Sequence, residues 1–245
     1  QLHFAMDEQN EESFIDRKRF LKKRAFDLVA DQTGKLMNPD VFTIVWARRF
    51  AGYKRADMVT RDRARFDALM SNTKYPVQIV WAGKPYPMDF TSIAVFDKIV
   101  NTCKTYPNCS ILVGYEIKLS KLLKLGSDVW LNTPRITHEA SGTSGMSAAM
   151  NGAVNVSIPD GWFPEFVKDG INGFTIPAAN PTLPDHELDE KDANSLYDIL
   201  ENTVIPMYYN NPAGWLELVK NGMRDIIPQF DSIRLAKEYY EKLYN

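Results

Sequence analysis

Short runs of apolar residues recur along the 245-residue chain, separated by longer segments with a different periodicity. The runs are apolar at successive positions rather than at alternate ones, which is typical of strands buried on both faces of a parallel sheet. We therefore predict strands over 41–46, 77–81, 110–113, 129–131, 153–157 and 173–176.

The segments between these runs carry apolar residues at helical spacing. They predict an N-terminal amphipathic helix over 12–31 and further helices near 56–70, 89–105, 117–125 and 139–151. Strands that alternate with helices at this spacing form repeated β-α-β units. The predicted fold class is therefore α/β, with a Rossmann-like doubly wound parallel sheet and C-terminal helices.

The C-terminal part of the chain has a different character. Residues 177–191 are rich in proline, aspartate and glutamate and predict an exposed connection. Residues 192–245 predict a helical segment that packs on the domain, with breaks near Pro212 and Pro228. We therefore expect residues 1–245 to form one domain.

Composition and charge narrow the functional classes. Lysine plus arginine (29) nearly balances aspartate plus glutamate (31), so the formal charge of −2 favours neither nucleic-acid nor membrane binding. Cys103 and Cys109 have no metal-site spacing, so we expect no metal and a reducing, cytoplasmic location. The first residues resemble no secretory signal and lack an initiator methionine, so we expect a piece of a longer polypeptide.

A basic segment follows the first predicted strand. Residues 47–55 place four cations, Arg48, Arg49, Lys54 and Arg55, at a strand end where open parallel sheets bind ligands. Arginine supplies a planar fork and lysine a point charge, so the segment can clamp a phosphate. A solvated basic turn is the alternative interpretation.

A small-residue loop, 137–146, follows the fourth predicted strand and leads into a helix. Glycine and serine let backbone amides approach an anion closely, and a helix N-terminus favours one. A tight strand-to-helix connection is the alternative. Glu139 can accept hydrogen bonds from sugar hydroxyls or cap the helix, and the aromatic pair Trp162-Phe163 predicts a hydrophobic lid more than a direct ligand contact.

Taken together, these loops resemble the α-glucan phosphorylases, the pyridoxal-phosphate-dependent members of the B-type glycosyltransferase fold. The basic segment 48–55, the turn Ala82-Gly83-Lys84, and the block Glu139-Ala-Ser-Gly-Thr-Ser-Gly-Met146 with Asn151-Gly152 and Asp160-Gly161 carry the resemblance. It extends over nearly the whole chain from about residue 12. It implies phosphorolysis of α-1,4-glucan to glucose 1-phosphate by an intact parent protein.

The resemblance also implies roles for individual residues. Arg49 and Lys54 would act as the catalytic cations on the phosphate groups, and Glu139, Ser141 and Gly142 would bind the glucosyl unit. The implied cofactor-binding residues are Arg48, Tyr115, Thr143, Ser144, Gly145 and Ser147. Tyr115 lies 24 residues before Glu139, which is the family spacing.

One position departs from the family pattern. The lysine that carries pyridoxal phosphate follows the methionine of the loop directly, and here that position is Ser147. A hydroxyl group forms no Schiff base. A noncovalently held cofactor, a relocated lysine and a non-phosphorolytic relative are the three alternatives that the sequence leaves open.

The resemblance finally implies partners that lie outside this chain. An N-terminal domain would supply the other wall of the substrate cleft, so we expect the fragment alone to be inactive. The expected ligands are α-1,4-glucan or maltooligosaccharide and inorganic phosphate, and the parent is compatible with a homodimer. The alternatives are a nucleotide-sugar-dependent retaining glycosyltransferase, whose second glutamate is again replaced by Ser147, and a catalytically silent glucan-binding module.

Overall fold

The computed structural model describes residues 11–114 and 116–244. Its centre is a six-stranded, all-parallel sheet with the order β3-β2-β1-β4-β5-β6. The strands are β1 Phe42–Ala47, β2 Val77–Gly83, β3 Cys109–Val113, β4 Val129–Asn132, β5 Val154–Ser157 and β6 Phe174–Thr175. This is the doubly wound order, so the predicted fold class is confirmed.

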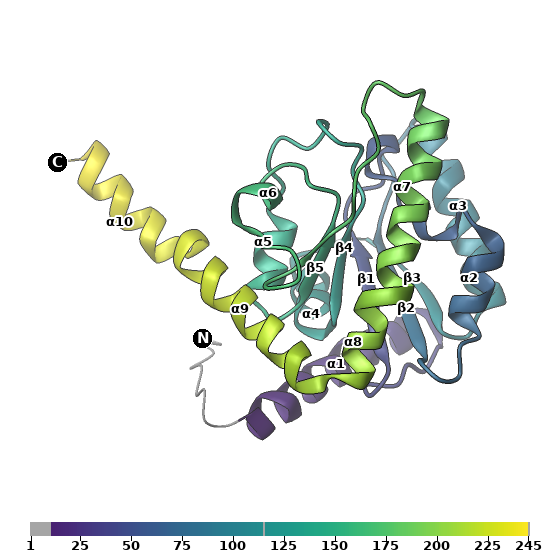
Figure 1. Ribbon diagram of the computed structural model, residues 1–245, viewed down its shortest axis with the longest axis horizontal. Coiled ribbons are helices and arrows are strands. Elements are labelled where there is room, and N and C mark those ends of the chain that lie inside the picture. Colours follow the sequence, from purple (N-terminus) through teal and green to yellow (C-terminus); the bar gives the residue numbers. More distant parts are fainter. Residues whose placement is uncertain (1–10, 115, 245) are drawn as a thin grey trace.

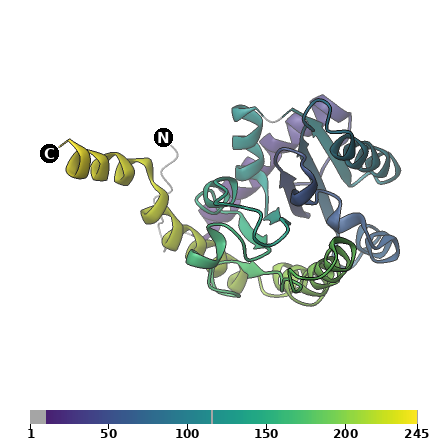
Figure 2. The same ribbon diagram turned by 90° about the horizontal axis from the view of Figure 1, so that it is seen from above.

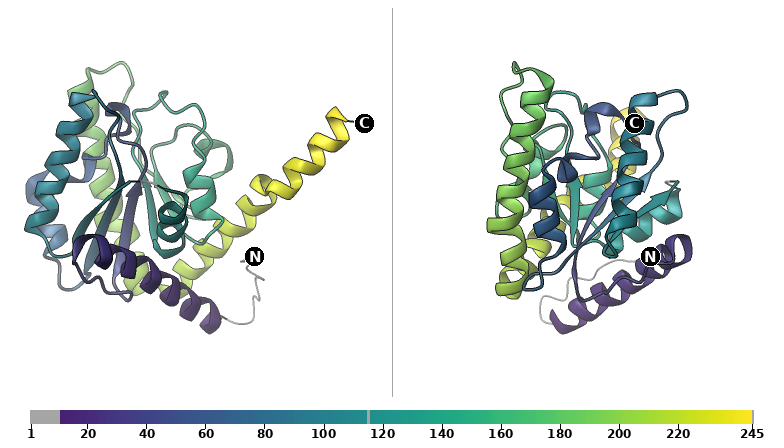
Figure 3. Two further views of the ribbon diagram at one scale, coloured as in Figure 1. Left: turned by 180° about the vertical axis from the view of Figure 1, so that it is seen from behind. Right: turned by 90° about the vertical axis from the view of Figure 1, so that its right-hand side faces the viewer.

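Helices cover both faces of the sheet (Figure 1; Figure 3). One face packs on α1 Glu11–Thr33, α4 Ile117–Gly126 and α5 Ser144–Ala149. The other packs on α2 Arg63–Met70, α3 Phe90–Thr105, α7 Asp185–Ile199, α8 Ile205–Asn210 and α9 Pro212–Phe230. The short helix α6 Phe163–Phe166 and the last helix, α10 Ser232–Leu243, complete the chain.

Strand β1 explains why the sequence pattern was continuous rather than alternating. Phe42, Ile44 and Trp46 point into the core on the α7 side, whereas Val45 and Ala47 point into the core on the α1 side. Every residue of β1 is buried. Both faces of the strand therefore require apolar side chains.

Three predicted elements differ from the structure. The helix expected over 56–70 is a short 3₁₀ turn, Met58–Thr60, followed by α2, whose N-cap Asp62 accepts from the Arg65 amide; a further 3₁₀ turn, Gly52–Lys54, lies before it. The helix expected over 139–151 is only Ser144–Ala149. The connection expected over 177–191 ends early because α7 begins at Asp185, directly after Pro184.

The C-terminal segment divides into a packed part and a projecting part. Helices α7 and α9 and the π-helical turn Leu200–Val204 between α7 and α8 contribute buried side chains to the core. Helix α10 has no buried residue and extends away from the sheet (Figure 1; Figure 2). Helix α9 continues through Pro228, and the break falls at Asp231 instead. Among the described residues, no helix combines the length and apolarity that a membrane span requires.

Candidate functional site

The candidate site lies where the strand order reverses. Strands β1 and β4 are neighbours, and the chain leaves β1 toward one edge of the sheet and β4 toward the other. In open parallel sheets, ligands bind beyond the carboxyl ends of strands at this switch point. The basic segment 48–55 and the loop 133–143 both begin there, so the sheet brings the two predicted motifs together.

The turn at the end of β2 holds the basic segment in place through backbone hydrogen bonds. The Arg48 amide donates to Ala82 O at 3.0 Å, and the Phe50 amide donates to Lys84 O at 3.2 Å. Gly83 has a φ of +148°, and a Cβ at this position would lie 2.1 Å from Arg48 O. Only glycine lets the two segments approach this closely. This close approach gives the Ala82-Gly83-Lys84 turn a structural role in positioning Arg48.

Glu139 joins two of the predicted cations. Its carboxylate accepts from Arg48 Nη2 at 2.9 Å and from Lys54 Nζ at 3.0 and 3.1 Å. The side chains of Arg48, Lys54 and Glu139 are 8%, 9% and 13% exposed. We call these three residues the ion cluster. Its charges are largely withdrawn from water, so the interaction among them is stronger than that of a surface pair.

The ion cluster does not use all of its hydrogen-bond donors. Among the described residues, Nε and Nη1 of Arg48 are buried without a hydrogen-bond partner. Arg49 is exposed, and no ion pair joins it to another described residue. Unpaired buried donors cost about 1–3 kcal/mol each. A ligand with several acceptor oxygens would satisfy them.

Asp160 fixes the backbone that carries Glu139. One of its carboxylate oxygens accepts from the amides of His138 and Glu139, at 3.0 and 2.8 Å. The other accepts from the Gly161 amide at 3.0 Å. The Asp-Gly pair was part of the sequence resemblance, but no local pattern around Asp160 indicates this bracing role.

Gly161 and Gly142 meet steric demands in the same loop. Gly161 has a φ of +61°, and a Cβ there would lie 2.2 Å from Ser141 O, the atom that accepts from the Trp162 amide at 3.0 Å. Gly142 has a φ of +80° and lies against the Glu139 side chain. Ser141 and Gly142 are therefore held beside Glu139 as the sequence predicted, with Ser141 exposed.

The glycine loop then enters α5 at Thr143, Ser144 and Gly145. Asn155 donates to Gly145 O at 3.0 Å, and Thr143 is the N-cap but makes no side-chain capping bond. Because α5 has only six residues, its dipole is weaker than the predicted helix over 139–151 would have provided. The hollow between this loop, Arg48 and Trp162 measures about 10 Å³, room for about one water molecule. The site is consequently one wall rather than a closed pocket.

Ser147 faces its own helix. Its hydroxyl donates to Thr143 O at 3.0 Å and to Ser144 O at 3.1 Å. Tyr115, the other implied cofactor residue with a distinctive side chain, lies outside the described residues. On α4, Lys118 and Lys121 are exposed, and burial lowers the pKa of Lys124. Lys54 is the described lysine that contacts Glu139.

Arg55, which the sequence placed among the four cations of the phosphate-clamping segment, is instead a buried structural residue. It is 2% exposed and adopts a left-handed backbone conformation with a φ of +47°. Its guanidinium donates to Thr133 O at 2.9 Å and Pro134 O at 2.6 Å, and pairs with Asp189 at 3.0 Å and Asp192 at 2.8 Å. It thereby ties the basic segment and the loop after β4 to α7.

Asp189 belongs to this brace as well. Burial alone would raise the pKa of Asp189, but the hydrogen bond from Arg135 and the charges of Arg61 and Arg55 lower it below the usual range. Arg135 also donates its backbone amide to Tyr53 O at 2.7 Å. Asp189 is therefore a charged anchor, although it lies in a segment that the sequence predicted to be an exposed connection.

Trp162 and Phe163 are buried. They are 6% and 1% exposed and pack with Phe166, Ile226 and Phe230. The lid interpretation fits this packing. The alternative, in which both aromatic rings form a glucan-binding surface, has little exposed ring area to support it, although Trp162 lines the small hollow beside Arg48.

Comparisons with known proteins agree with the geometry. A sequence model of carbohydrate phosphorylases matches residues 2–169. The chain is 43% identical over 231 residues to an uncharacterized protein of Methanocaldococcus jannaschii, covering 94% of this chain and 42% of that relative. It is 38% identical over 232 residues to the maltodextrin phosphorylase of Thermococcus litoralis, covering 93% and 28%. It is 35% identical over 237 residues to the glycogen phosphorylase of Aquifex aeolicus, covering 94% and 34%. The chain thus spans less than half the length of each of these relatives.

Proposed function

The chain belongs to the carbohydrate phosphorylase family, and on that premise we propose that it forms the phosphate-binding and glucosyl-binding wall of an α-glucan phosphorylase-type glycosyltransferase. The observation that carries the proposal is the ion cluster of Arg48, Lys54 and Glu139 at the switch point of the sheet. In the intact parent, phosphate would cleave the terminal α-1,4 bond of a glucan or maltooligosaccharide and yield glucose 1-phosphate.

The cations bind the attacking phosphate in this proposal. Arg49 is exposed and Arg48 retains two unpaired donors, so both can bind phosphate oxygens without breaking a described ion pair. Lys54 completes the cradle once phosphate competes with Glu139 for its ammonium group. Three cations against one cluster carboxylate leave the positive excess that an attacking phosphate requires.

Glu139 orients the sugar in this proposal. Its backbone is fixed by Asp160, and its carboxylate is an acceptor beside the exposed Ser141 and Thr143. Sugar hydroxyls donate well to a carboxylate, and the neighbouring loop amides donate to sugar oxygens. The backbone from Ser141 to Gly145 therefore lines the glucosyl position, with Glu139 as its charged acceptor.

The family in general uses pyridoxal phosphate, but the residues of this chain do not fit its covalent attachment. Attachment requires a primary amine, whereas Ser147 offers a hydroxyl group. This hydroxyl group is already hydrogen-bonded to the backbone carbonyl oxygens of Thr143 and Ser144. We therefore assign Arg48, Thr143, Ser144 and Gly145 to anion and sugar binding rather than to covalent attachment of the cofactor.

The remaining wall of the cleft belongs to a part of the parent that this chain lacks. The described loops form an open surface with a hollow of about 10 Å³, which is too small for a glucosyl unit. The chain alone would therefore bind phosphate without turnover. Its main partner in this proposal is the N-terminal domain of the parent. The parent protein is compatible with a homodimer. Two buried, free cysteines, Cys103 and Cys109, are in keeping with a cytoplasmic location.

Phosphate binding by the chain tests the proposal directly. Isothermal titration calorimetry with inorganic phosphate should give one site in the wild type and at least tenfold weaker binding in Arg49→Ala, because one charge-assisted bond is lost. Arg24→Ala, which removes an exposed arginine from α1, is the matched control and should change nothing. Equal phosphate affinity in Arg49→Ala and the wild type would contradict the assignment.

Ser147 favours one second candidate, a silent glucan-binding module. The two candidates differ in the full-length parent supplied with pyridoxal phosphate, maltooligosaccharide and phosphate. Release of glucose 1-phosphate supports the phosphorylase, whereas glucan binding without release supports the silent module. A nucleotide-sugar-dependent enzyme would instead bind a nucleoside diphosphate at the same cations.

A further inference from the structure

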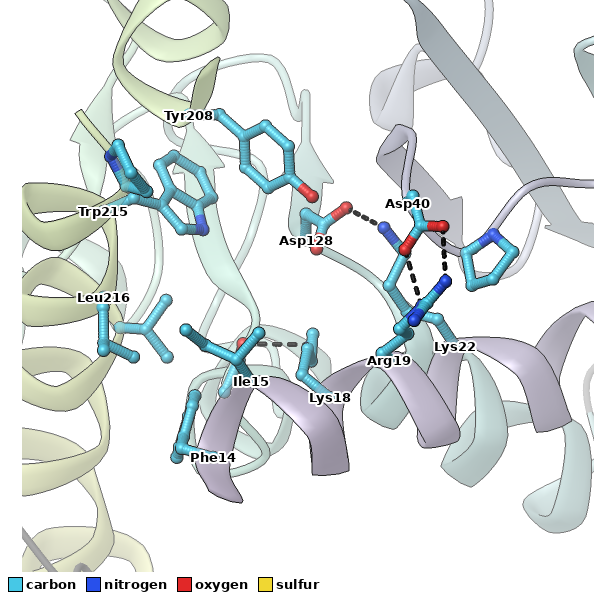
Figure 4. Close-up of a pocket in the computed structure, with 14 residues that line it drawn as sticks. Phe14, Ile15, Lys18, Arg19, Lys22, Asp40, Asp128, Tyr208, Trp215 and Leu216 are labelled. Atoms are coloured by element: carbon cyan, nitrogen blue, oxygen red, sulfur yellow. Dashed lines mark hydrogen bonds and ion pairs between the residues drawn. The ribbon is translucent and has the colours of Figure 1, made fainter. Parts of the chain in front are cut away.

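A second cavity lies near the starts of β1 and β4, whereas the ion cluster lies beyond the ends of these strands. Figure 4 shows the residues that line this cavity. It has a volume of about 280 Å³ and is lined by α1, the approach to β1, the start of β4, and helices α8 and α9. This volume is close to the lower end of the roughly 300–1,000 Å³ range of small-molecule pockets.

One side of the cavity is apolar and partly aromatic. Phe14 and Ile15 come from α1, and Trp215, Leu216 and Val219 come from α9 (Figure 4). Trp215 packs edge-on against Tyr208 with ring centroids 5.3 Å apart, which holds both rings in place. These side chains present a fixed surface on which a flat ring can pack.

The other side is charged, and both of its carboxylates already have cationic partners. Lys22 pairs with Asp128 at 2.6 Å, with both side chains buried, and Arg19 pairs with Asp40 at 2.7 Å. Asp128 also accepts from the Thr43 amide at 2.8 Å. Within each pair the positive and negative charges cancel, so neither pair presents a net charge to a ligand.

Lys18 supplies the charge that remains. Its ammonium group donates to the carbonyl oxygens of Ser127 and Gly152, and no described carboxylate forms an ion pair with it. An ammonium group has three donors, so one is left for a ligand. Burial lowers the pKa of Lys18 to about 8, an effect that the charge of Asp128 opposes and that of Lys22 adds to. An anion in the cavity would relieve this cost.

We propose that this cavity binds a small aromatic carboxylate, with the ring between α1 and α9 and the carboxylate on Lys18. The lining carries three cations and two carboxylates, a net charge of +1, which matches a monoanion. The Tyr208 hydroxyl, which makes no hydrogen bond within the described part of the chain, lies on the same side as Asp128 and donates to the second carboxylate oxygen (Figure 4). This site is independent of the proposed phosphate site.

The test uses 2-naphthoate as the probe and 2-naphthamide as its neutral isostere, each titrated into the chain by calorimetry. Naphthoate should bind one site per chain at least tenfold more tightly than the amide, because a charge-assisted bond replaces a neutral one. Lys18→Met should reduce naphthoate binding to the level of the amide. Lys23→Met, an exposed lysine on the same helix, is the matched control and should change nothing.

Two further measurements distinguish a loss of binding in the cavity from misfolding of a variant and from binding at another site. In the wild type, naphthoate should shift the methyl resonances of Leu216 and Val219, and Leu216→Trp should abolish binding of both probes by filling the cavity. Saturating phosphate should leave naphthoate affinity unchanged. Absence of naphthoate binding, retention of full affinity in Lys18→Met, or competition with phosphate would each overturn the proposal without touching the phosphate site.

Discussion

Replacing Glu139 with glutamine should make the stability of the chain depend more strongly on phosphate than that of the wild type. Glutamine keeps the size of the side chain but removes the charge that faces Arg48 at 2.9 Å and Lys54 at 3.0 Å. The two cations then remain mostly buried without an anion. In phosphate-free buffer, the variant should therefore be less stable than the wild type.

The burial of the ion cluster sets the size of the effect. Removing one partner of a buried ion pair costs about 3–5 kcal/mol, and the 13% exposure of Glu139 gives water some access, so we expect about 3 kcal/mol. For a domain of this length, this corresponds to a fall of roughly 6–12 °C in Tm. Phosphate at a hundred times its Kd should restore about 2.7 kcal/mol by binding the native state alone.

Thermal unfolding followed by circular dichroism, in buffer without oxyanions and then with increasing phosphate, measures both effects. Glu165→Gln, which neutralises an exposed glutamate in α6, is the matched control and should behave as the wild type does. If Glu139→Gln unfolds within 2 °C of the wild type and gains no more from phosphate, the ion cluster is not the anion site.

Four further outcomes follow from the same contacts. Arg48→Met should leave the free energy of unfolding within about 1 kcal/mol, since the lost ion pair is offset by removal of two unpaired buried donors, while calorimetry shows at least tenfold weaker phosphate binding. Arg55→Met should cost about 3–5 kcal/mol in urea unfolding, because it leaves the buried Asp192 of α7 without its cationic partner and removes one of the arginines that pair with Asp189. Lys18 has a folded-state pKa of about 8, below its unfolded value, so the unfolded chain binds more protons between pH 8 and 10.5. The wild type should therefore gain about 3 kcal/mol relative to Lys18→Met as pH rises through that window. Ser147→Lys should acquire imine absorbance with pyridoxal phosphate, and a spectrum equal to that of the wild type would show that more than the amine is missing.

The fold was predictable because strands buried on both faces carry apolar residues at successive positions, a pattern that can be recognised in the sequence. The runs that became β1 and β2 are buried along their whole length, and this pattern depends on few long-range details. The start of α7 was missed for the opposite reason. Asp185, Glu187 and Asp189 suggest a solvated connection, yet the buried Asp189 pairs with three arginines, Arg55, Arg61 and Arg135, that lie more than 50 residues earlier in the chain. No local pattern contains that information.

The candidate site was likewise only partly predictable from the sequence. The motifs located Arg48, Lys54 and Glu139, because strand ends on one edge of a parallel sheet must meet. They did not distinguish the neighbours Arg48 and Arg49, of which one is buried on the ion cluster and the other is exposed. Successive residues of an extended backbone point to opposite sides, but which side faces the cluster depends on the turn at Gly83. The ion pairs themselves are products of tertiary packing.

Anion binding and cofactor attachment have different physical requirements in this chain, and only one of them is missing. Attachment depends on a single amine at position 147, whereas the anion cradle depends on backbone fixed by Gly83 and Asp160 and on the charges of Arg48 and Lys54. Among the described residues, the Ser147 side chain hydrogen-bonds to carbonyl oxygens at the start of its own helix, so a serine there removes no described support from the cradle. If the proposed function holds, the phosphate site is independent of the Schiff base, and phosphate affinity and cofactor absorbance have to be measured as separate properties.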